Sequence, residues 1–216
     1  MKQKASVIDC YDKSANAYAE QFMQELEGKS LDRLLLRRFA EDNGHKGLML
    51  DLACGPGHTT LFLRNQGVEN LLGLDISPQM VEVAHDWHKG KIAFAEADML
   101  ALPFRNDHAA SAICFYGIVH FTYEELDQAL KEIRRVLQAG GQFLFSFHIG
   151  EGLEHVSEFL GQEVEIDFQY FEVERVREIA LAAGWEIKEV VERHPYEGVE
   201  YPSRRGYFLL QKPLLN

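Results

Sequence analysis

Short apolar segments alternate with amphipathic segments along most of this chain. The apolar segments are apolar at consecutive positions and end in small or acidic residues, which is typical of strands buried on both faces of a sheet. Between them, apolar residues recur at every third or fourth position, which predicts helices. The predicted strands span 47–54, 70–77, 91–97, 110–115, 142–148, 185–193 and 206–211. The predicted helices span 31–41, 59–65, 78–89, 123–138 and 173–183.

Residues with strong positional preferences mark several helix ends. Ser30 and Thr122 are the expected N-caps of two helices, and Glu125 is placed to complete a capping box with Thr122. Gly140 and Gly141 follow the last turn of the helix that Thr122 begins, and we expect them to end it.

The alternation of strands and helices predicts an α/β fold. We expect a Rossmann-like, doubly wound, three-layer α/β/α architecture around a mostly parallel sheet of seven strands. The last two predicted strands are close enough in sequence to form a hairpin, so the final strand is expected to be antiparallel. A chain of 216 residues fits one domain, 1–216. Within it, 1–45 is expected to form an N-terminal helical cover, and the aromatic- and glycine-rich insert 149–171 a lid or a dimer contact.

Acidic residues outnumber basic residues in the chain. There are 22 Lys and Arg against 34 Asp and Glu, a formal net charge of −12. This charge repels phosphate backbones, and no basic stripe offsets it, so we expect no nucleic-acid partner. The sequence shows neither an apolar run of membrane-spanning length nor a signal-peptide pattern. We therefore expect a soluble, cytoplasmic protein with no membrane partner; a homodimer is compatible with the sequence.

The cysteines and histidines show no metal-binding pattern. Cys10, Cys54 and Cys114 lack the paired spacing of zinc ligands, and we expect them to be reduced thiols. The nine histidines are scattered along the chain. We expect no metal site.

The segment Asp51-Leu-Ala-Cys-Gly-Pro-Gly57 follows a predicted strand and opens a short helix. Gly55 and Gly57 allow the backbone to approach a ligand that a side chain would exclude. The dinucleotide-binding fingerprint requires a third glycine at position 60, where this chain has Thr60. A nicotinamide or flavin site is therefore disfavoured.

Acidic residues also end the next two predicted strands. Asp75 is placed to accept hydrogen bonds from both hydroxyls of a ribose. Asp98 is placed to accept the amino group of an adenine, while the amide of Met99 donates to a ring nitrogen. Met80 and Leu100 are placed to cover the faces of that ring.

Taken in order, these segments resemble the nucleoside-binding motifs of class I S-adenosylmethionine (SAM)-dependent methyltransferases, of the small-molecule, ubiquinone/menaquinone methyltransferase-like type. The resemblance covers about Tyr11 to Phe147. It implies transfer of a methyl group from SAM, the expected cofactor, to a small-molecule acceptor. One position departs from the family pattern, because Ala53 replaces the first glycine of the loop. Alanine favours a negative φ, and we expect Ala53 to have one.

The resemblance also implies the cofactor-binding residues. The loop after the first strand would hold the methionine part of SAM, and two tyrosines of the N-terminal segment would approach its carboxylate. The segment after the fourth strand would lie beside the methionine and the methyl group. The full set is Tyr11, Tyr18, Asp51, Ala53, Gly55, Gly57, Asp75, Ile76, Met80, Asp98, Met99, Leu100, Phe115 and Tyr116.

Methyl transfer from a sulfonium depends mainly on positioning, and a general base is needed only where the acceptor must lose a proton. His120 and His148 lie just past two predicted strand ends and are the candidate catalytic residues, as bases or as orienting groups. Arg204 and Arg205 lie between the last two strands, where they could clamp a carboxylate or phosphate of the acceptor. Tyr123 is a further candidate for substrate binding.

Other functions are compatible with the same residues. One is a methyltransferase acting on a protein or tRNA, although the Asn/Asp-Pro-Pro-Tyr/Phe segment of amino-group methylation is absent after the fourth strand. Another is a SAM-binding protein without turnover, and a third is a nicotinamide oxidoreductase. A Rossmann-like domain that uses its glycines only for tight turns is also compatible. Serine hydrolase chemistry is disfavoured, because neither G-x-S-x-G nor S-x-x-K occurs.

Overall fold

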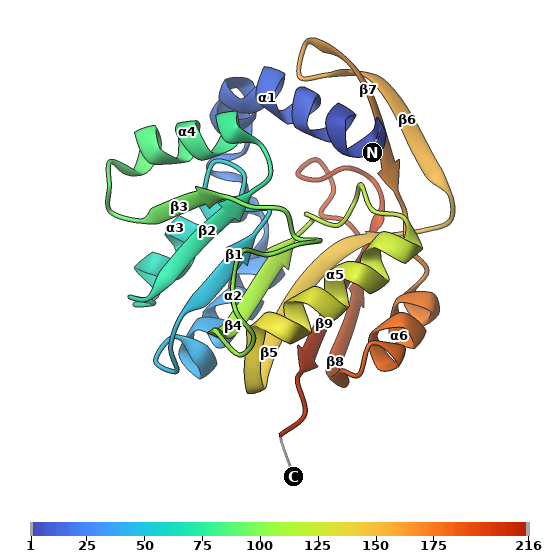
Figure 1. The fold of residues 1–216 in the computed structure, drawn as a ribbon. Helices are drawn as coiled ribbons and strands as arrows, with labels where there is room; N and C mark the ends of the chain where they lie inside the picture. The colour runs from blue at the N-terminus through green and yellow to red at the C-terminus, as the bar shows by residue number, and fades with distance from the viewer. Residues whose placement is uncertain (1, 215–216) are drawn as a thin grey trace.

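Seven strands form one sheet in the computed structural model, which describes residues 2–214 (Figure 1). They are β1 (Met49–Leu52), β2 (Leu71–Asp75), β3 (Ala93–Glu96), β4 (Ala109–Phe115), β5 (Leu137–Ile149), β8 (Glu186–Arg193) and β9 (Arg204–Gln211). The strand order is β3-β2-β1-β4-β5-β9-β8. Only β9 pairs antiparallel with its neighbours in this sheet. The predicted fold class is confirmed, including the antiparallel final strand.

Helices cover both faces of the sheet, and one helix crosses its carboxyl edge (Figure 1). They are α1 (Lys2–Phe22), α2 (Ser30–Asn43), α3 (His58–Asn65), α4 (Pro78–His88), α5 (Tyr123–Val136) and α6 (Val173–Ala182), with a 3-10 turn η1 (Glu25–Gly28) before α2.

Alternate residues along the strands face different helical layers. Ala112 lies in the core cluster with α5 and α6, whereas the neighbouring Ile113 lies in the cluster with α2 and α3. Phe143 and Leu144 divide in the same way. Because side chains alternate between the faces of a strand, a strand covered on both faces must be apolar at consecutive positions. This accounts for the continuous apolar runs in the sequence.

The capping box predicted for α5 is present. The amide of Glu125 donates to Thr122 Oγ1 over 3.2 Å, and the amide of Thr122 donates to Glu125 Oε2 over 2.9 Å. Ser77 caps α4 in a similar way by accepting from the amide of Met80. These bonds satisfy amides that the first helical turn leaves unpaired, and they fix where each helix begins.

Two predicted helix ends are wrong. Lys29 is the N-cap of α2, and Ser30 lies inside the helix with its hydroxyl bonded to Tyr196 Oη. The helix α5 ends at Val136 and the chain enters β5 directly, so Gly140 and Gly141 lie within that strand. Gly140 has φ +76° there, a conformation that suits glycine as well in a bend of a strand as at the end of a helix.

The segment between β5 and α6 folds into a hairpin that the sequence pattern did not predict. Its strands are β6 (Leu153–Phe159) and β7 (Gln162–Gln169), which pair with each other and not with the main sheet. Val164 and Ile166 of β7 pack against Cys10 of α1 in one apolar cluster. Figure 1 shows α1 and this hairpin together above the carboxyl edge of the sheet. We call α1 and the β6–β7 hairpin the roof.

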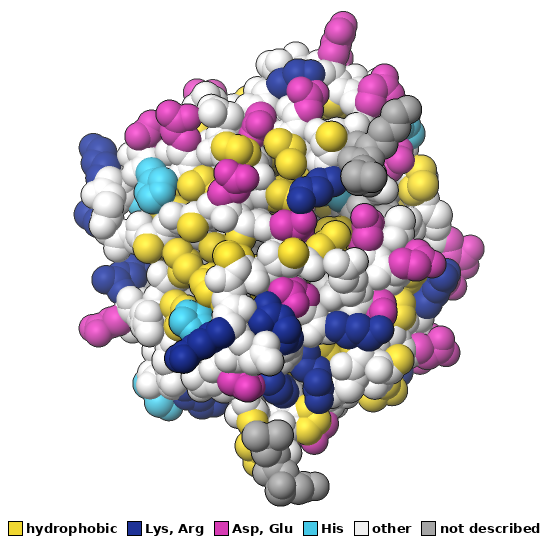
Figure 2. All heavy atoms as spheres, viewed as in Figure 1, with side chains coloured by type: hydrophobic (Ala, Val, Ile, Leu, Met, Phe, Trp, Pro, Cys, Tyr) yellow, Lys and Arg dark blue, Asp and Glu magenta, His cyan; other side chains and the backbone are white. Residues whose placement is uncertain are grey.

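Within residues 2–214, no helix has the length and apolar character that crossing a membrane requires. In the same part of the chain, no group of three or more His, Cys, Asp and Glu side chains is placed to hold a metal ion. Figure 2 shows most Lys and Arg side chains of one face gathered in its lower half, with a few acidic side chains between them and more of them above and at the edges.

The aromatic stack in the sheet should dominate the stability of this fold. Phe145 is fully buried, and its ring centroid lies 5.0 Å from that of Phe143 and 5.6 Å from that of Phe208. We expect Phe145→Ala to lower the free energy of unfolding by about 3–5 kcal/mol, because it leaves a cavity among rigid rings. Urea denaturation measures this change. Leu34→Ala, at a side chain 58% exposed, is the control and should change it by less than about 0.5 kcal/mol. A loss of similar size in both variants would contradict the assignment of the core.

Candidate functional site

A cavity of about 590 Å³ lies between the roof and the carboxyl edge of the sheet. Its floor is formed by the ends of β1, β2 and β4, as expected for an open α/β sheet. Its walls come from the turn η1, the end of β5 and the loop that joins β8 to β9. The predicted site residues that line it are Tyr11, Tyr18, Asp51, Ala53, Gly55, Asp75, Ile76, Met80, Phe115, Tyr116, His120, His148 and Arg205.

A smaller cavity of about 70 Å³ adjoins the larger one. It is lined by Asp98, Met99 and Leu100, the residues predicted to surround an adenine. Ala53 and Ile76 border both cavities. One elongated ligand could therefore place a purine in the smaller cavity and an amino-acid group in the larger one.

Three predicted site residues line neither cavity. Gly57, with φ +83°, is the N-cap of α3, and an added Cβ would meet the Phe94 ring at 2.7 Å, so this glycine serves local packing. Arg204 is exposed and pairs with Glu192 over 2.5 Å. Tyr123 begins α5, and its hydroxyl accepts the amide of Glu172.

The loop after β1 turns through two residues with positive φ. Gly55 has φ +53°, and an added Cβ there would meet nothing closer than Tyr18 at 3.8 Å, so the loop faces open space. Ala53 also has φ +53°, which corrects our expectation of a negative value. Its methyl group is accommodated because the facing residue is Gly117, where an added Cβ would lie 2.4 Å from Ala53 Cβ. The alanine therefore adopts a left-handed backbone conformation at a cost in strain.

Asp75 connects the loop after β1 to the loop after β2. Its Oδ2 accepts the amide of Gly55 over 2.8 Å, and its Oδ1 accepts the amide of Ser77 over 2.9 Å. Burial raises the pKa of this carboxyl, whereas these amide bonds oppose the change. Each carboxylate oxygen retains a second lone pair, so Asp75 is still able to accept hydrogen bonds from hydroxyl groups of a ligand in the cavity.

Asp51 lies deeper, at the end of β1. Thr60 Oγ1 donates to Asp51 Oδ2 over 2.6 Å. Burial raises the pKa of Asp51 to about 7. Thr60, which argued against a dinucleotide site in the sequence, thus holds the acid of the glycine loop in place.

Asp98 receives two hydrogen bonds at the edge of the smaller cavity. The amide of Leu100 donates to Oδ1 over 2.8 Å, and Lys4 Nζ of α1 donates to Oδ2 over 2.6 Å. The ion pair with Lys4 joins the roof to the edge of the smaller cavity.

His120 lies under the roof in a defined tautomer. Its Nδ1 is bonded to the carbonyl oxygen of Asp167 over 2.8 Å, so Nδ1 carries the proton. Its Nε2 therefore accepts from the hydroxyl of Tyr11, also over 2.8 Å. Burial lowers the pKa of His120 to about 4, so the ring is neutral at physiological pH.

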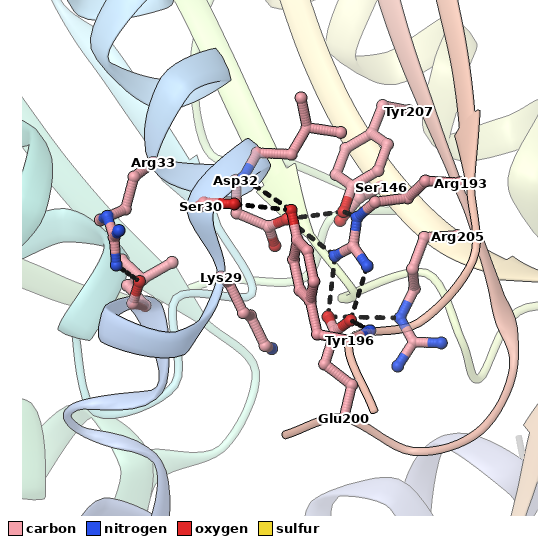
Figure 3. A network of polar contacts seen from close by, with 12 residues as sticks. Lys29, Ser30, Asp32, Arg33, Ser146, Arg193, Tyr196, Glu200, Arg205 and Tyr207 are labelled. Carbon is pink, nitrogen blue, oxygen red and sulfur yellow. Dashed lines mark hydrogen bonds and ion pairs between the residues drawn. The ribbon is translucent and has the colours of Figure 1, made fainter. Parts of the chain in front are cut away.

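A buried network of charges and hydroxyls lies behind another wall of the cavity, to which it contributes Tyr116 and Glu200 (Figure 3). Asp32 Oδ1 accepts from Tyr207 Oη over 2.6 Å and from Arg193 Nη2 over 3.0 Å. Asp32 Oδ2 accepts from Tyr116 Oη over 3.1 Å. Arg193 also donates to both carboxylate oxygens of Glu200, over 2.6 and 2.8 Å. The network fixes Tyr116, whose φ of +58° turns the chain towards the cavity.

Three residues of the site were missed in the sequence. Glu25 accepts from Lys29 Nζ over 2.6 Å, and its other oxygen lies 2.9 Å from His58 Nε2. Burial opposes ionisation of Glu25, but the bonds from His58 and Lys29 lower its pKa to about 2. His58 Nδ1 is buried without a partner in the described part of the chain. The position of His58 directly after the glycine loop is a sequence signal that could have placed it at the site. The i, i+4 spacing of Glu25 and Lys29 is a weaker signal of the same kind.

This cluster and the loop fit the polar groups of SAM. An anionic carboxylate and a cationic amine, Glu25 and Lys29, complement the ammonium and carboxylate of an amino acid. Asp75 lines the larger cavity and Asp98 the smaller one, where their carboxylate oxygens could accept hydrogen bonds from ribose hydroxyls and from an adenine amino group. The glycine loop leaves room for the ligand backbone between these ends.

Comparisons with known proteins indicate the kind of domain that carries this site. Residues 49–141 match a family model described as a methyltransferase domain. A malonyl-[acyl-carrier protein] O-methyltransferase of Erwinia billingiae is 30% identical over 71% of this chain and 58% of its own length. A ubiquinone/menaquinone biosynthesis C-methyltransferase of Idiomarina loihiensis is 28% identical over 95% of this chain and 88% of its own. A solved SAM-dependent methyltransferase of Methanosarcina mazei has a TM-score of 0.69 at 17% identity, covering 77% of this chain and 92% of its own. The chain spans about half the length of the first curated relatives that it matches.

The strain at Ala53 and the space at Gly117 should be coupled. We expect Gly117→Ala to lower the free energy of unfolding by about 1–3 kcal/mol, because the new methyl group would overlap Ala53 Cβ at 2.4 Å and approach Cys114 Sγ at 2.7 Å. Ala53→Gly should raise it by about 1 kcal/mol. When Gly117→Ala is already present, Ala53→Gly should raise the free energy of unfolding by more than it does in the wild type, with a coupling energy above about 0.5 kcal/mol. Urea denaturation of the four proteins measures the cycle, and strictly additive changes would contradict the contact.

The buried neutral state of His120 predicts a pH-dependent stability difference. The unfolded chain gains a proton on this histidine near pH 6.5, whereas the folded protein gains it only near pH 4. The wild type therefore loses stability at this site as the pH falls from 6.5 towards 4, by up to about 1.4 kcal/mol per pH unit.

His120→Asn removes this titration, and all other groups titrate alike in both proteins. We expect the variant to be less stable than the wild type above pH 6.5 and the gap to narrow below it. Denaturant unfolding of both proteins across this range measures the gap. A gap that is constant with pH would show that His120 is not held neutral by the fold.

Proposed function

We propose that this chain, which belongs to the class I SAM-dependent methyltransferases, transfers the methyl group of SAM to a small-molecule acceptor. The observation that carries the proposal is the convergence of strand ends. The glycine loop, Asp75 and the Asp98 subsite border two adjoining cavities, so the parts of one adenosyl amino acid have their partners side by side.

In the proposed reaction, a nucleophilic atom of the acceptor bonds to the methyl carbon while the carbon–sulfur bond breaks. The electron pair of that bond stays on sulfur, and S-adenosylhomocysteine (SAH) is released. The leaving group is already cationic, so the contribution of the protein is alignment and exclusion of water. Glu25 and Lys29 would hold the amino-acid end of the donor, Asp75 its ribose and Asp98 its adenine.

His120 and His148 are proposed to orient the acceptor and to take its proton where it has one to lose. Both are neutral, because burial lowers their pKa values to about 4 and about 3. A neutral histidine has a lone pair available, but so low a pKa makes it a weak base. This supports orientation as the main role of both residues.

A small acceptor is supported by the enclosure of the cavity. Phe159 and Phe168 of the hairpin and Tyr11 of α1 line it under the roof, so a macromolecule would have to insert a side chain or base there. The net charge of −12 also disfavours tRNA. A protein or tRNA acceptor is the alternative that the same assay tests.

The proposal predicts that the affinity for SAM depends strongly on Asp75. We expect Asp75→Asn to weaken SAM binding roughly 10- to 100-fold, because a buried charged acceptor of hydroxyl groups is lost. Isothermal titration of SAM and of SAH measures the affinity. Asp127→Asn, at an ion pair on the exposed side of α5, is the matched control and should leave it unchanged. Equal affinity in all three proteins would remove Asp75 from the site.

Activity is tested by incubating the chain with methyl-labelled SAM and separate fractions of metabolites, protein and tRNA. The expected result is SAH formation with label in the small-molecule fraction. Label confined to protein or tRNA would overturn the small-molecule acceptor. SAM binding without SAH in any fraction would overturn the enzymatic role.

A further inference from the structure

One arginine at the cavity wall has a hydrogen-bond donor that the described residues leave unpaired. Arg205 lies at the start of β9 with 2% of its surface exposed, and it lines the larger cavity. Its Nη1 donates to Ser203, and its Nη2 donates to the carbonyl of Tyr201 over 2.9 Å. Its Nε is buried and has no hydrogen-bond partner among residues 2–214. An unpartnered buried donor costs about 1–3 kcal/mol, so a ligand that accepts from it would be favoured.

The nearest carboxylate does not satisfy this arginine. Glu200 Oε1 lies 3.8 Å from Arg205 Nε, beyond hydrogen-bond distance. Both oxygens of Glu200 are already bound by Arg193, and the amide of Tyr196 donates to one of them as well. Figure 3 shows Glu200 between the two arginines. The charge of Arg205 is therefore only partly compensated.

A second cationic side chain, Lys29, lies at the same wall of the cavity. Lys29 Nζ lies 4.9 Å from the ring centroid of Tyr116, and Arg205 Cζ lies 5.6 Å from it. Both side chains line the cavity. Lys29 donates to Glu25 and is proposed for the amino-acid end of SAM, so of the two cations Arg205 remains for the acceptor.

The pKa of His148 is lowered in part by a positive electrostatic potential at this end of the cavity. His148 lies opposite Arg205 in the pairing of β5 with β9, and its Nδ1 is 2.6 Å from Ser203 Oγ, which also accepts from Arg205. Burial, and after it the positive charges of Arg205 and Lys29, lower the pKa of His148 to about 3, although Glu200 opposes them. The net effect of these fixed charges disfavours a cation and favours an anion beside the ring.

Aromatic side chains enclose the same end. The ring of His148 lies 5.4 Å from that of Tyr116 and 6.2 Å from those of Tyr170 and Tyr201, all measured between centroids. All four line the cavity. The hydroxyls of Tyr170 and Tyr201 donate to Glu154 of the hairpin, which holds these rings in place. The walls beside the cationic group are therefore flat and apolar and suit a planar group.

We propose that the acceptor of this enzyme is a small organic acid whose carboxylate binds Arg205 and His148 while its planar part lies among Tyr116, Tyr170 and Tyr201. The inference rests on the proposed function, because it names the class of the small-molecule acceptor. The guanidinium presents N–H groups in a plane that matches the two oxygens of a carboxylate. Arg204, the neighbouring candidate, has no part in this site because it points away from the cavity to Glu192.

The test compares benzoate with its neutral isostere benzamide. Each is titrated into the full chain with SAH bound, and binding is followed by chemical-shift changes in NMR spectra. We expect benzoate to bind at least about tenfold more tightly than benzamide, and Arg205→Met to abolish that preference while SAH affinity stays unchanged. Arg204→Met is the matched control, one position away, and should keep the preference.

Arg205 also holds the loop before β9, so Arg205→Met could fail to fold. Arg205→Lys, which keeps the charge but loses the planar fork, and His148→Gln then provide the test; each should reduce the preference several-fold. Equal binding of benzoate and benzamide to the wild type, or an undiminished preference in the Arg205 variants, would overturn the proposal and leave Arg205 as a structural clip of the loop.

The two proposals fail separately. If SAH does not bind, the proposed function fails, and titration of benzoate into the free chain still decides whether Arg205 binds a carboxylate. If SAH binds and the protein binds benzoate no more tightly than benzamide, only the proposed acceptor class is wrong.

Discussion

The carboxylate of Asp75 is the interaction on which the cofactor side of this structure depends. It accepts one amide from the loop after β1 and one from the loop after β2, so a single side chain fixes the relative position of two neighbouring loops. Both bonds form within the chain, so the turn at Gly55 is set independently of any ligand. A site built in this way loses little conformational entropy on binding. The unusual backbone of Ala53 is supported by the same arrangement, together with the empty position opposite it at Gly117.

On the other side of the cavity, buried charges are organised so that most have a direct partner. Asp32 and Glu200 share Arg193, and Glu25 is held by Lys29 and His58. Breaking one partner of such a pair is costly, because the other charge is left buried. The network thereby holds the loop between β8 and β9 against α2. Arg205 lies at the edge of this network, lines the cavity and has, within the described chain, an unpaired Nε donor. Asp32 and Arg193, in contrast, have their partners within the network.

Much of the fold could be predicted because it follows from local pattern. Continuous apolar strands, the capping box of α5 and the acids at strand ends are all readable within short windows of sequence, and the topology of parallel sheets brings those strand ends together. The two wrong helix ends have a common cause. Glycine and serine fit several backbone positions, so Gly140 is used in a bend of β5 and Ser30 within α2.

The remainder depends on contacts between distant segments. The β6–β7 hairpin has many exposed charged residues, and its apolar face is defined by α1, which lies far away in the chain. Arg204 and Arg205 could not be separated, since adjacent residues of a strand face opposite sides and the choice depends on the register with β5. The arrangement of Glu25 and His58 likewise appears only when η1 packs beside α3.

The independence of the roof from the seven-stranded sheet has a consequence for exchange of ligands. The hairpin pairs only with itself, so raising α1 and the hairpin would break side-chain packing and a few polar links such as Lys4–Asp98, and no ladder of the main sheet. Such a local opening costs far less than unfolding of the whole chain. The rate at which a bound molecule would leave and the resistance of the fold to denaturation therefore depend on different sets of residues, so either could change without the other.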